Sequence, residues 1–328
     1  MRAAIIPLLA LLAVLCGTAD AVRNIWPGTP WKDVNGNALH AHGGQILTVN
    51  GQYYWVGETD KASSSNRGVN LYSSPDLLAW TFRGTLVTAS QIKQSTGNSG
   101  VTVVERPKIV FNRNTNKYVL YIHLDNSDYS YASVGVYTAS SVTGPYQFVR
   151  SIRPNGLESR DLGVFIDDDQ TPYLLYASGH VNTHVTISRL TSDGTNSAGI
   201  VSQIQGGLES PTILKGNGGY YLILSTTTGW SPNAGKHYWA SSLSGPWWDN
   251  GALSTTSNTH NSQPTYLLPL QGRSGTKYLY MGDRWSHPNL ASASYVWLPV
   301  KLGAKGTNPG VQIQWKGDKW DLDAYLNE

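Results

Sequence analysis

Four polar residues stand in otherwise apolar segments and belong to types that can move protons. Each lies a similar distance before a short aromatic strand: Glu105, Asp161, Glu209 and Gln263. If those strands meet round one axis, the four side chains face a common pocket. Burying several carboxylates together costs free energy unless one is protonated or paired, so such a cluster is more often functional than structural. For any single acid, the alternative is that it satisfies its own turn or a neighbouring cation such as Arg106 or Arg160.

Two carboxyl groups on either side of a cleft suit the hydrolysis of a glycosidic bond. One acid with a raised pKa protonates the leaving oxygen, while a second group activates water or attacks directly. The content of 12 Trp and 19 Tyr agrees with a sugar substrate, because sugar rings stack on aromatic faces. Trp230, Trp285 and Tyr129 lie in irregular segments after strands, where loops would line the mouth of a cleft. Core packing is the alternative for each of them and the better interpretation for most other aromatic residues.

The elements that must position these groups recur five times. Each copy is a short strand, rich in aromatic and aliphatic residues, that follows turn residues: 52–58, 117–123, 172–178, 219–225 and 277–283. Successive copies begin 47 to 65 residues apart, which leaves room for four short strands with variable loops. The segments 140–146 and 241–247 also share the pattern Ser-Ser-x-x-Gly-Pro-aromatic.

Periodic four-stranded units predict an all-β fold, a five-bladed β-propeller over residues 22–328. A propeller arranges its sheets radially and leaves few strand edges exposed. The alternative is a β-sandwich whose strands resemble one another by accident, and the shared strand endings disfavour it. We find no convincing amphipathic helix after residue 21.

Residues 1–21 have the pattern of a secretory signal peptide. Arg2 precedes an apolar run over residues 3–17, and Ala19-Asp20-Ala21 has the small-x-small form of a cleavage site. We therefore expect a secreted, extracellular protein. Cleavage also removes Cys16, the single cysteine of the sequence, so the mature protein would have no cysteine chemistry. No later stretch has the length and apolarity that a membrane span needs.

The charge pattern argues against several classes of protein. The net charge is +3, 14% of residues are charged and no long basic run occurs, so a nucleic-acid partner is not expected. Low charge with 40% hydrophobic residues excludes intrinsic disorder. Residues 167–169 are acidic but lack the alternating spacing of a calcium loop. His180 and His184 lack the intervening glutamate of a zinc-binding helix. We predict neither a metal site nor a cofactor.

Several of these segments resemble one known family. Residues 160–176 and 208–212 are similar to the third- and fourth-blade motifs of glycoside hydrolase family 43. Residues 41–44, 104–108 and 262–265 resemble its galactan-cleaving branch, the exo-β-1,3-galactanases. The resemblance covers nearly all of the chain after the signal peptide, and it implies a five-bladed propeller that inverts the anomeric configuration of its substrate.

The resemblance also implies roles for the polar residues. Glu209 would be the general acid, and Asp161 would position substrate and raise the pKa of Glu209 by like-charge repulsion. Most of the wider family has an aspartate base on the first blade, but this chain has His42-Gly43-Gly44 there. The branch suggests that Gln263 serves instead, although a neutral amide is a poor proton acceptor. It would hold the water by hydrogen bonds or act through a minor imidic tautomer.

Glu105 is the rival for activating the water, because it is an ordinary carboxylate in the same register. The branch implies that Glu105 binds sugar hydroxyls, so we assign Gln263 to the water and Glu105 to substrate. His42 is a third candidate for activating the water. The alternative for His42 is a purely structural hydrogen bond, which is the better interpretation. The resemblance further implies ligands for the sugar in the cleavage subsite: Glu58, Tyr129, Asn182 and Thr226.

The predicted activity is release of galactose from the β-1,3-galactan backbone of arabinogalactan by a monomeric enzyme. One alternative is another activity of the same family, α-L-arabinofuranosidase or β-xylosidase, which the absent first-blade aspartate disfavours. The other alternative is a sugar-binding propeller without catalysis. The absent base favours that interpretation, while retention of Glu209 and Asp161 opposes it.

Overall fold

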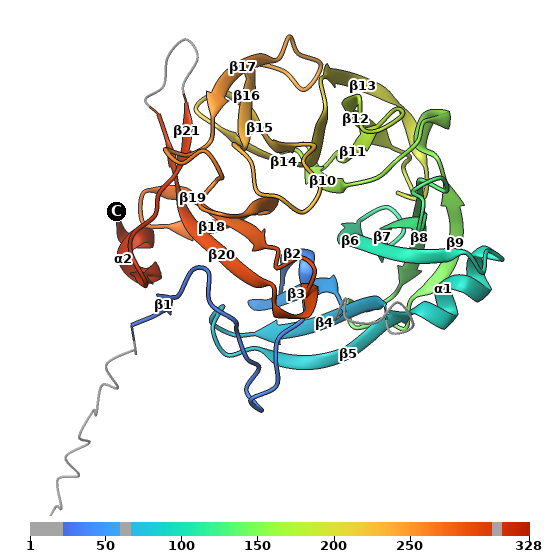
Figure 1. Cartoon of the computed structure of the whole chain (residues 1–328), viewed down its shortest axis with the longest axis horizontal. Helices are drawn as coiled ribbons and strands as arrows, with labels where there is room; N and C mark the ends of the chain where they lie inside the picture. The colour runs from blue at the N-terminus through green and yellow to red at the C-terminus, as the bar shows by residue number, and fades with distance from the viewer. Residues whose placement is uncertain (1–21, 60–66, 304–309) are drawn as a thin grey trace, which may run out of the picture.

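The structure is a computed structural model that describes residues 22–59, 67–303 and 310–328. The predicted signal peptide and Cys16 lie outside the described residues. Twenty strands form five antiparallel four-stranded sheets, and Figure 1 shows these sheets arranged radially as the blades of a propeller. The predicted five-bladed β-propeller is therefore confirmed, and the β-sandwich alternative is wrong.

The strands of each blade follow one another in the sequence. Blade 1 contains β2 (His42–Val49), β3 (Gln52–Glu58), β4 (Gly68–Ser74) and β5 (Thr81–Thr88). Blade 2 contains β6 (Val101–Asn112), β7 (Lys117–Asn126), β8 (Ser133–Ala139) and β9 (Gln147–Ile152). Blade 3 contains β10 (Leu162–Ile166), β11 (Pro172–Ser178), β12 (His184–Leu190) and β13 (Ser197–Gln205). Blade 4 contains β14 (Leu208–Gly216), β15 (Gly219–Thr226), β16 (Lys236–Ala240) and β17 (Trp248–Ala252). Blade 5 contains β18 (Gln263–Gly272), β19 (Gly275–Arg284), β20 (Ser294–Leu302) and β21 (Val311–Ile313).

The recurring aromatic strand of the sequence is the second strand of every blade. β3 and β11 have the predicted bounds, β7 and β15 extend by three residues and one residue at the end of the strand, and β19 is longer at both ends. The first strands line the axis, since each contacts the first strand of the next blade and β18 contacts β2 to close the ring. A second strand is therefore covered on both faces by neighbouring blades, which explains its continuous apolar run.

Apolar side chains fill the spaces between blades. Trp55, Trp80, Tyr295 and Trp297 are each at most 2% exposed and pack together where blade 1 meets blade 5. The hairpin between β2 and β3 shows how turn chemistry sets strand register. Asn50 and Gly51 both have positive φ, 50° and 77°, as a two-residue hairpin turn requires.

Two short helices contradict the expectation that the chain has none. α1 (Ala89–Thr96) begins at Thr88, whose hydroxyl accepts from the Gln91 N–H, and ends at Gly97 in the left-handed conformation. α2 (Leu322–Asn327) begins at Asp321. Each helix buries no more than two residues, so neither leaves a long apolar stripe in the sequence.

The two ends of the described chain meet beside blade 5. β1 (Asn24–Ile25) pairs antiparallel with β22 (Trp320–Asp321), and the Arg23 guanidinium pairs with the Asp323 carboxylate. Among the residues that the structure describes, no helix has both the length and the apolarity to cross a membrane.

Candidate active site

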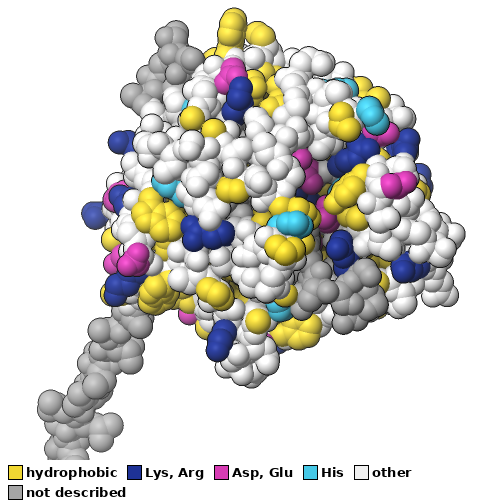
Figure 2. Space-filling model, viewed as in Figure 1, with side chains coloured by type: hydrophobic (Ala, Val, Ile, Leu, Met, Phe, Trp, Pro, Cys, Tyr) yellow, Lys and Arg dark blue, Asp and Glu magenta, His cyan; other side chains and the backbone are white. Residues whose placement is uncertain are grey.

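A cleft of about 680 Å³ opens at one end of the propeller axis. Figure 2 shows acidic side chains recessed near the middle of one face of the molecule. All five blades or the loops that follow their strands contribute to the lining, which includes Glu58, Glu105, Arg106, His123, Tyr129, Asp161, Asn182, Glu209, Trp230, Gln263 and Trp285. The four polar residues that the sequence places in register therefore share one cleft.

Irregularities in the first strands accompany two of these side chains, Glu105 and Glu209, and also the equivalent position His42. The strand pairing shifts register just after His42, Glu105 and Glu209. The next residue in each case has positive φ: Gly43 at 59°, Arg106 at 51° and Ser210 at 58°. Such β-bulges bend a strand and turn a side chain out of the regular alternation, and they occur often beside active sites. A β-bulge at the equivalent position therefore recurs in three blades.

Glu209 has the environment of a carboxylic acid that keeps its proton at neutral pH. Its Oε1 accepts from Gln263 Nε2 at 2.9 Å and its Oε2 from Asn182 Nδ2 at 3.3 Å. Burial, and then the negative charge of Asp161, raise the pKa of Glu209 to about 8, against a smaller opposite effect of Arg106. The side chain can therefore donate a proton to a leaving group near pH 7.

Asp161 lies beside that acid and pairs with a buried arginine. Its Oδ2 lies 3.0 Å from Arg106 Nε and accepts from the Ser210 hydroxyl at 2.8 Å. Ser210 directly follows Glu209, so this hydrogen bond ties the third blade to the fourth at the acid. The carboxylate of Asp161 therefore lies where its charge raises the pKa of Glu209, as the family resemblance implies.

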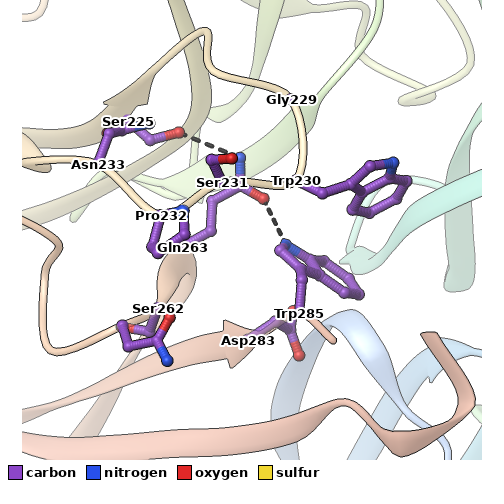
Figure 3. A pocket seen from close by; sticks show the side chains of 11 residues that line it. Ser225, Gly229, Trp230, Ser231, Pro232, Asn233, Ser262, Gln263, Asp283 and Trp285 are labelled. Carbon is purple, nitrogen blue, oxygen red and sulfur yellow. Dashed lines mark hydrogen bonds between the residues drawn. The ribbon is translucent and has the colours of Figure 1, made fainter. Parts of the chain in front are cut away.

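The amide of Gln263 uses every hydrogen-bonding position that it has. Its oxygen accepts from Arg106 Nη2 at 2.5 Å and from Trp285 Nε1 at 2.8 Å. Its nitrogen donates to Glu209 Oε1 and, at 3.2 Å, to Ser225 Oγ. Figure 3 shows the side chain between Ser225 and Trp285, with Trp230 beside Trp285. These bonds fix which end of the amide faces the acid.

Arg106 is a central residue of the site that the sequence indicated only as a partner for an acid. Beyond Asp161 and Gln263, its Nη1 donates to the Pro264 carbonyl at 3.0 Å, and its backbone N–H donates to Glu58 Oε1 at 3.0 Å. Although the guanidinium is buried, nearby negative charges, Asp161 first, raise its pKa. In the sequence, Arg106 was visible only as a cation inside the apolar run 103–111. The structure shows that this arginine on blade 2 contacts residues of blades 1, 3 and 5.

A second buried group, on blade 2, surrounds Glu105. The Glu105 Oε2 atom lies 3.4 Å from Nδ1 of His123, whose Nε2 lies 3.1 Å from Asp125 Oδ2. Glu105, His123 and Asp161 could each offer a ligand atom within 4.8 Å of the others, a spacing that a metal ion can bridge. However, both nitrogens of His123 face carboxylates, an arrangement that favours a proton on each and leaves no lone pair for a metal. The donor set therefore does not fit a metal centre.

Most of the sugar ligands implied by the sequence lie at the cleft. Glu58 brings a carboxylate from β3, so blade 1 does supply an acid, from its second strand. Tyr129 is 37% exposed on the wall, and its carbonyl accepts from Arg160 Nη2 at 2.8 Å. Asn182 contacts Glu209 directly. Thr226 is not among the lining residues, because it ends β15 in pairing with Leu208, and the next residue, Thr227, lines the cleft.

His42 lies behind the cleft and does not line it. The imidazole is 2% exposed, and its Nδ1 is 2.9 Å from Asp283 Oδ1, while Asp283 Oδ2 accepts from the Gly43 N–H at 2.7 Å. Burial would raise the pKa of Asp283, but the hydrogen bond to His42 and the other contacts lower it. The structure thus places His42 in a polar contact between blades 1 and 5.

Comparisons with known proteins agree with this geometry. The sequence model of Glycosyl hydrolases family 43 matches residues 40–267. A β-D-galactofuranosidase, xynD of Aspergillus niger, is 28% identical over 234 residues, which is 68% of this chain and 64% of that protein. The chain thus spans somewhat less than two thirds of the length of this curated relative.

Solved structures resemble the chain more strongly. An exo-β-1,3-galactanase from Phanerochaete chrysosporium, solved with β-1,3-galactotriose, is 40% identical with a TM-score of 0.82, over 92% of this chain and 68% of that one. The exo-β-1,3-galactanase of Clostridium thermocellum is 34% identical with a TM-score of 0.82, over 92% and 67%. A family 43 β-1,3-galactosidase solved with galactodeoxynojirimycin is 32% identical with a TM-score of 0.82, over 91% of this chain and its own whole length.

Proposed function

The chain belongs to family 43 of the glycosyl hydrolases, and we propose that it is an inverting exo-β-1,3-galactanase. Its substrate would be the β-1,3-galactan backbone of arabinogalactan, from which it releases galactose. The observation that carries this proposal is that Glu209, whose pKa is raised to about 8, lies in a cleft that Gln263, Trp230 and Trp285 also line. Neighbours named as exo-β-1,3-galactanases at 40% and 34% identity support the choice of substrate.

In this proposal Glu209 gives its proton to the glycosidic oxygen as the bond to the anomeric carbon breaks. Burial and the charge of Asp161 keep that proton available near neutral pH. Arg106 pairs with Asp161 and not with Glu209, so the two carboxyl groups have separate roles. Removing a general acid of this kind typically costs about 10²- to 10⁴-fold in rate.

Gln263 is assigned to the attacking water. Its oxygen already accepts two hydrogen bonds, one from a guanidinium, and these stabilise negative charge on the amide. The nitrogen, which faces Glu209, is then the atom that exchanges protons. After cleavage an N–H proton of Gln263 passes to the Glu209 carboxylate, and the amide nitrogen takes the proton of the attacking water. Both side chains return to their starting forms, and the hydroxyl adds to the anomeric carbon.

Glu105 and Glu58 are assigned to the hydroxyls of the sugar, with Tyr129 on the wall of the subsite. A carboxylate accepts hydrogen bonds and does not donate them, so it discriminates hydroxyl groups by position. Trp230 and Trp285, whose ring centroids lie 5.3 Å apart, provide the apolar faces on which a sugar ring stacks. Thr226 and His42 have no direct role in this scheme, because neither lines the cleft.

The test of the function is incubation with β-1,3-galactan and β-1,3-galactotriose, followed by chromatography of the products. We expect galactose from the first time point, with no accumulation of longer fragments from the polysaccharide. Aryl α-L-arabinofuranoside, β-xyloside and β-galactofuranoside serve as comparison substrates, and preferential cleavage of any of them would replace the proposed specificity. Binding of galactotriose without any cleavage would make the protein a sugar-binding propeller.

We also propose that the protein is secreted after loss of residues 1–21 and acts as a monomer. The support is the signal-peptide pattern at the N-terminus. Expression in a secreting host, with N-terminal sequencing of protein from the medium, should give Val22 as the first residue. Light scattering on the purified protein should give the mass of one chain.

A further inference from the structure

The buried histidine of blade 2 has no role in the scheme above, yet it contacts one of the assigned residues. His123 lies on β7, is 0% exposed and faces carboxylates with both ring nitrogens. Glu105 Oε2 is 3.4 Å from Nδ1 on the side of the cleft, and Asp125 Oδ2 is 3.1 Å from Nε2 on the side of the core. The three side chains form a line from the interior of blade 2 to the cleft.

The inner end of this line is anchored to the backbone. Asp125 is 0% exposed, and its Oδ1 accepts from the N–H groups of Asn126, Tyr131 and Ala132 at 2.8–3.0 Å. Three N–H donors stabilise the ionised form of a buried carboxylate. Asp125 is therefore anchored to the backbone, and it orients the ring of His123 through Nε2.

The charges around His123 also require its ring to be an imidazolium cation. Two buried carboxylates that flank one neutral ring would leave an uncompensated negative charge in the protein interior, which is costly. Burial by itself would lower the pKa of His123, but the hydrogen bond to Asp125 and the nearby carboxylate of Glu105 outweigh it and raise the pKa to about 9. The imidazolium balances one of the two carboxylates.

Other charged groups face this line as well. Arg160 Nε is 3.9 Å from Asp125 Oδ2 and shares the charge of that carboxylate. Asp161 lies in the same cluster as Glu105 and His123, and adds negative charge on the cleft side. The ring of Tyr129 is 6.2 Å from the His123 ring, and the charge of Glu105, followed by burial, raises the Tyr129 pKa, so this phenol stays neutral.

We propose that His123 is a positioning residue, an imidazolium fixed between Asp125 and Glu105 that keeps the Glu105 carboxylate ionised and directed into the cleft as an acceptor for sugar hydroxyls. The role of Glu105 comes from the proposed function, so this inference rests on it. The charge state of His123, in contrast, is a property of the resting protein and can be measured without substrate.

The first experiment is ¹⁵N NMR of protein labelled in histidine, titrated from pH 5.5 to 9. The matched control is His237, which is also buried, at 3% exposed, but whose Nε2 accepts from the Val311 N–H and whose pKa burial lowers. We expect both nitrogens of His123 to remain protonated through pH 7.5, while His237 is neutral. The signals are assigned with His123→Gln and His237→Gln. A neutral His123 ring at pH 7.5 would overturn the proposal.

The second experiment compares His123→Gln and Asp125→Asn with wild type in the cleavage of β-1,3-galactotriose over pH. A carboxylate that loses its cation takes up a proton at higher pH. We therefore expect the acid limb of kcat/KM to move upward by about 1 pH unit, with KM raised about 10-fold and kcat changed less. His237→Gln should leave both limbs in place. Thermal unfolding of each variant identifies loss of fold, and Asp125→Asn keeps hydrogen-bond acceptors if the His123 variant does not fold.

Three results would contradict this assignment. One is a uniform fall in kcat with an unchanged pH profile and KM, which indicates a structural role alone. Another is activity that disappears with a chelator and returns with a divalent metal, together with the NMR shift of a metal-bound ring. The third is an unshifted profile in folded His123→Gln. If wild type cleaves no galactan, the NMR result still decides the charge of His123, and binding of galactose at pH 5.5 and 7.5 replaces the kinetic readout.

Discussion

Glu209→Gln tests two consequences of one pKa, in stability and in catalysis. The folded protein binds the Glu209 proton more tightly than the unfolded chain, because burial and Asp161 raise the pKa from 4.5 to about 8. Stability from this group therefore falls as the pH rises through that interval, and the full penalty is present above pH 8. The introduced amide is neutral at every pH and removes the penalty.

The magnitude follows from the shift in pKa. The interval between 4.5 and about 8 corresponds to roughly 5 kcal/mol in the wild-type protein at high pH. Entry of water and relaxation of the side chain reduce such penalties, so we expect about 2 kcal/mol of stabilisation at pH 9, or roughly 4 °C in Tm. At pH 6 the folded side chain is neutral but the unfolded one is already ionised, so somewhat less than half of the penalty is present and the difference should be about 1 kcal/mol. It approaches zero only below pH 4.5, where both states are neutral.

The local hydrogen bonds allow this substitution. The amide oxygen can accept from Gln263 Nε2 in place of Glu209 Oε1. The new NH2 group would face the donor Nδ2 of Asn182, but the Asn182 Oδ1 atom is buried without a hydrogen-bond partner. Rotation of the Asn182 amide therefore turns an acceptor toward the new donor, and both atoms are satisfied.

The assay has a stability arm and a catalytic arm. Tm is measured at pH 6 and 9, with Asp249→Asn as a control. Asp249 is an exposed carboxylate that pairs with Lys236 far from the cleft, and its pKa is lowered. Release of galactose from β-1,3-galactotriose should fall at least about 10³-fold in Glu209→Gln. An aryl β-galactoside with a leaving group that needs no proton should lose much less. Equal Tm differences at the two pH values, or turnover within 10-fold of wild type, would refute the reasoning.

Three further predictions concern the same cleft. Asp161→Asn removes a negative charge and leaves Arg106 unbalanced, so the pKa of Glu209 falls and the alkaline limb of kcat/KM should move down by about 1 pH unit or more; an upward shift would contradict the charge assignment. Azide should restore turnover to Gln263→Ala if Gln263 activates the attacking water. If azide rescues Glu105→Ala alone, Glu105 is the residue that activates the water. NMR of the first product from β-1,3-galactotriose should show the α anomer of galactose, since a β product indicates retention.

The fold was largely predictable because its unit repeats. The second strand of each blade is buried between neighbours, so it carries a continuous apolar run, and the bounds of β3 and β11 were predicted to the residue. The two helices were missed because α1 buries only Ile92, which leaves no periodic pattern to detect. Short elements that depend on a cap and one contact are specified by tertiary packing more than by sequence period.

Part of the site was also predictable, because the position of a residue along a strand determines the side to which its side chain points. Glu105, Asp161, Glu209 and Gln263 precede equivalent strands, and the structure brings them to one cleft. Residues whose role depends on a contact across blades were harder to find. Thr226 stays a prediction, since the lining of the cleft includes its neighbour Thr227.

The sequence by itself determined the repeat, the radial arrangement of sheets and the identity of the groups round the axis, because these depend on periodic burial and on the order of residues along each strand. Only the tertiary structure decided which of those groups carries charge. Glu209 is neutral because it is buried and because Asp161 lies beside it from another blade, and His123 is cationic because Glu105 and Asp125 face its two nitrogens. A charge state is set by the sum of burial and nearby charges in three dimensions, and no single strand contains that sum.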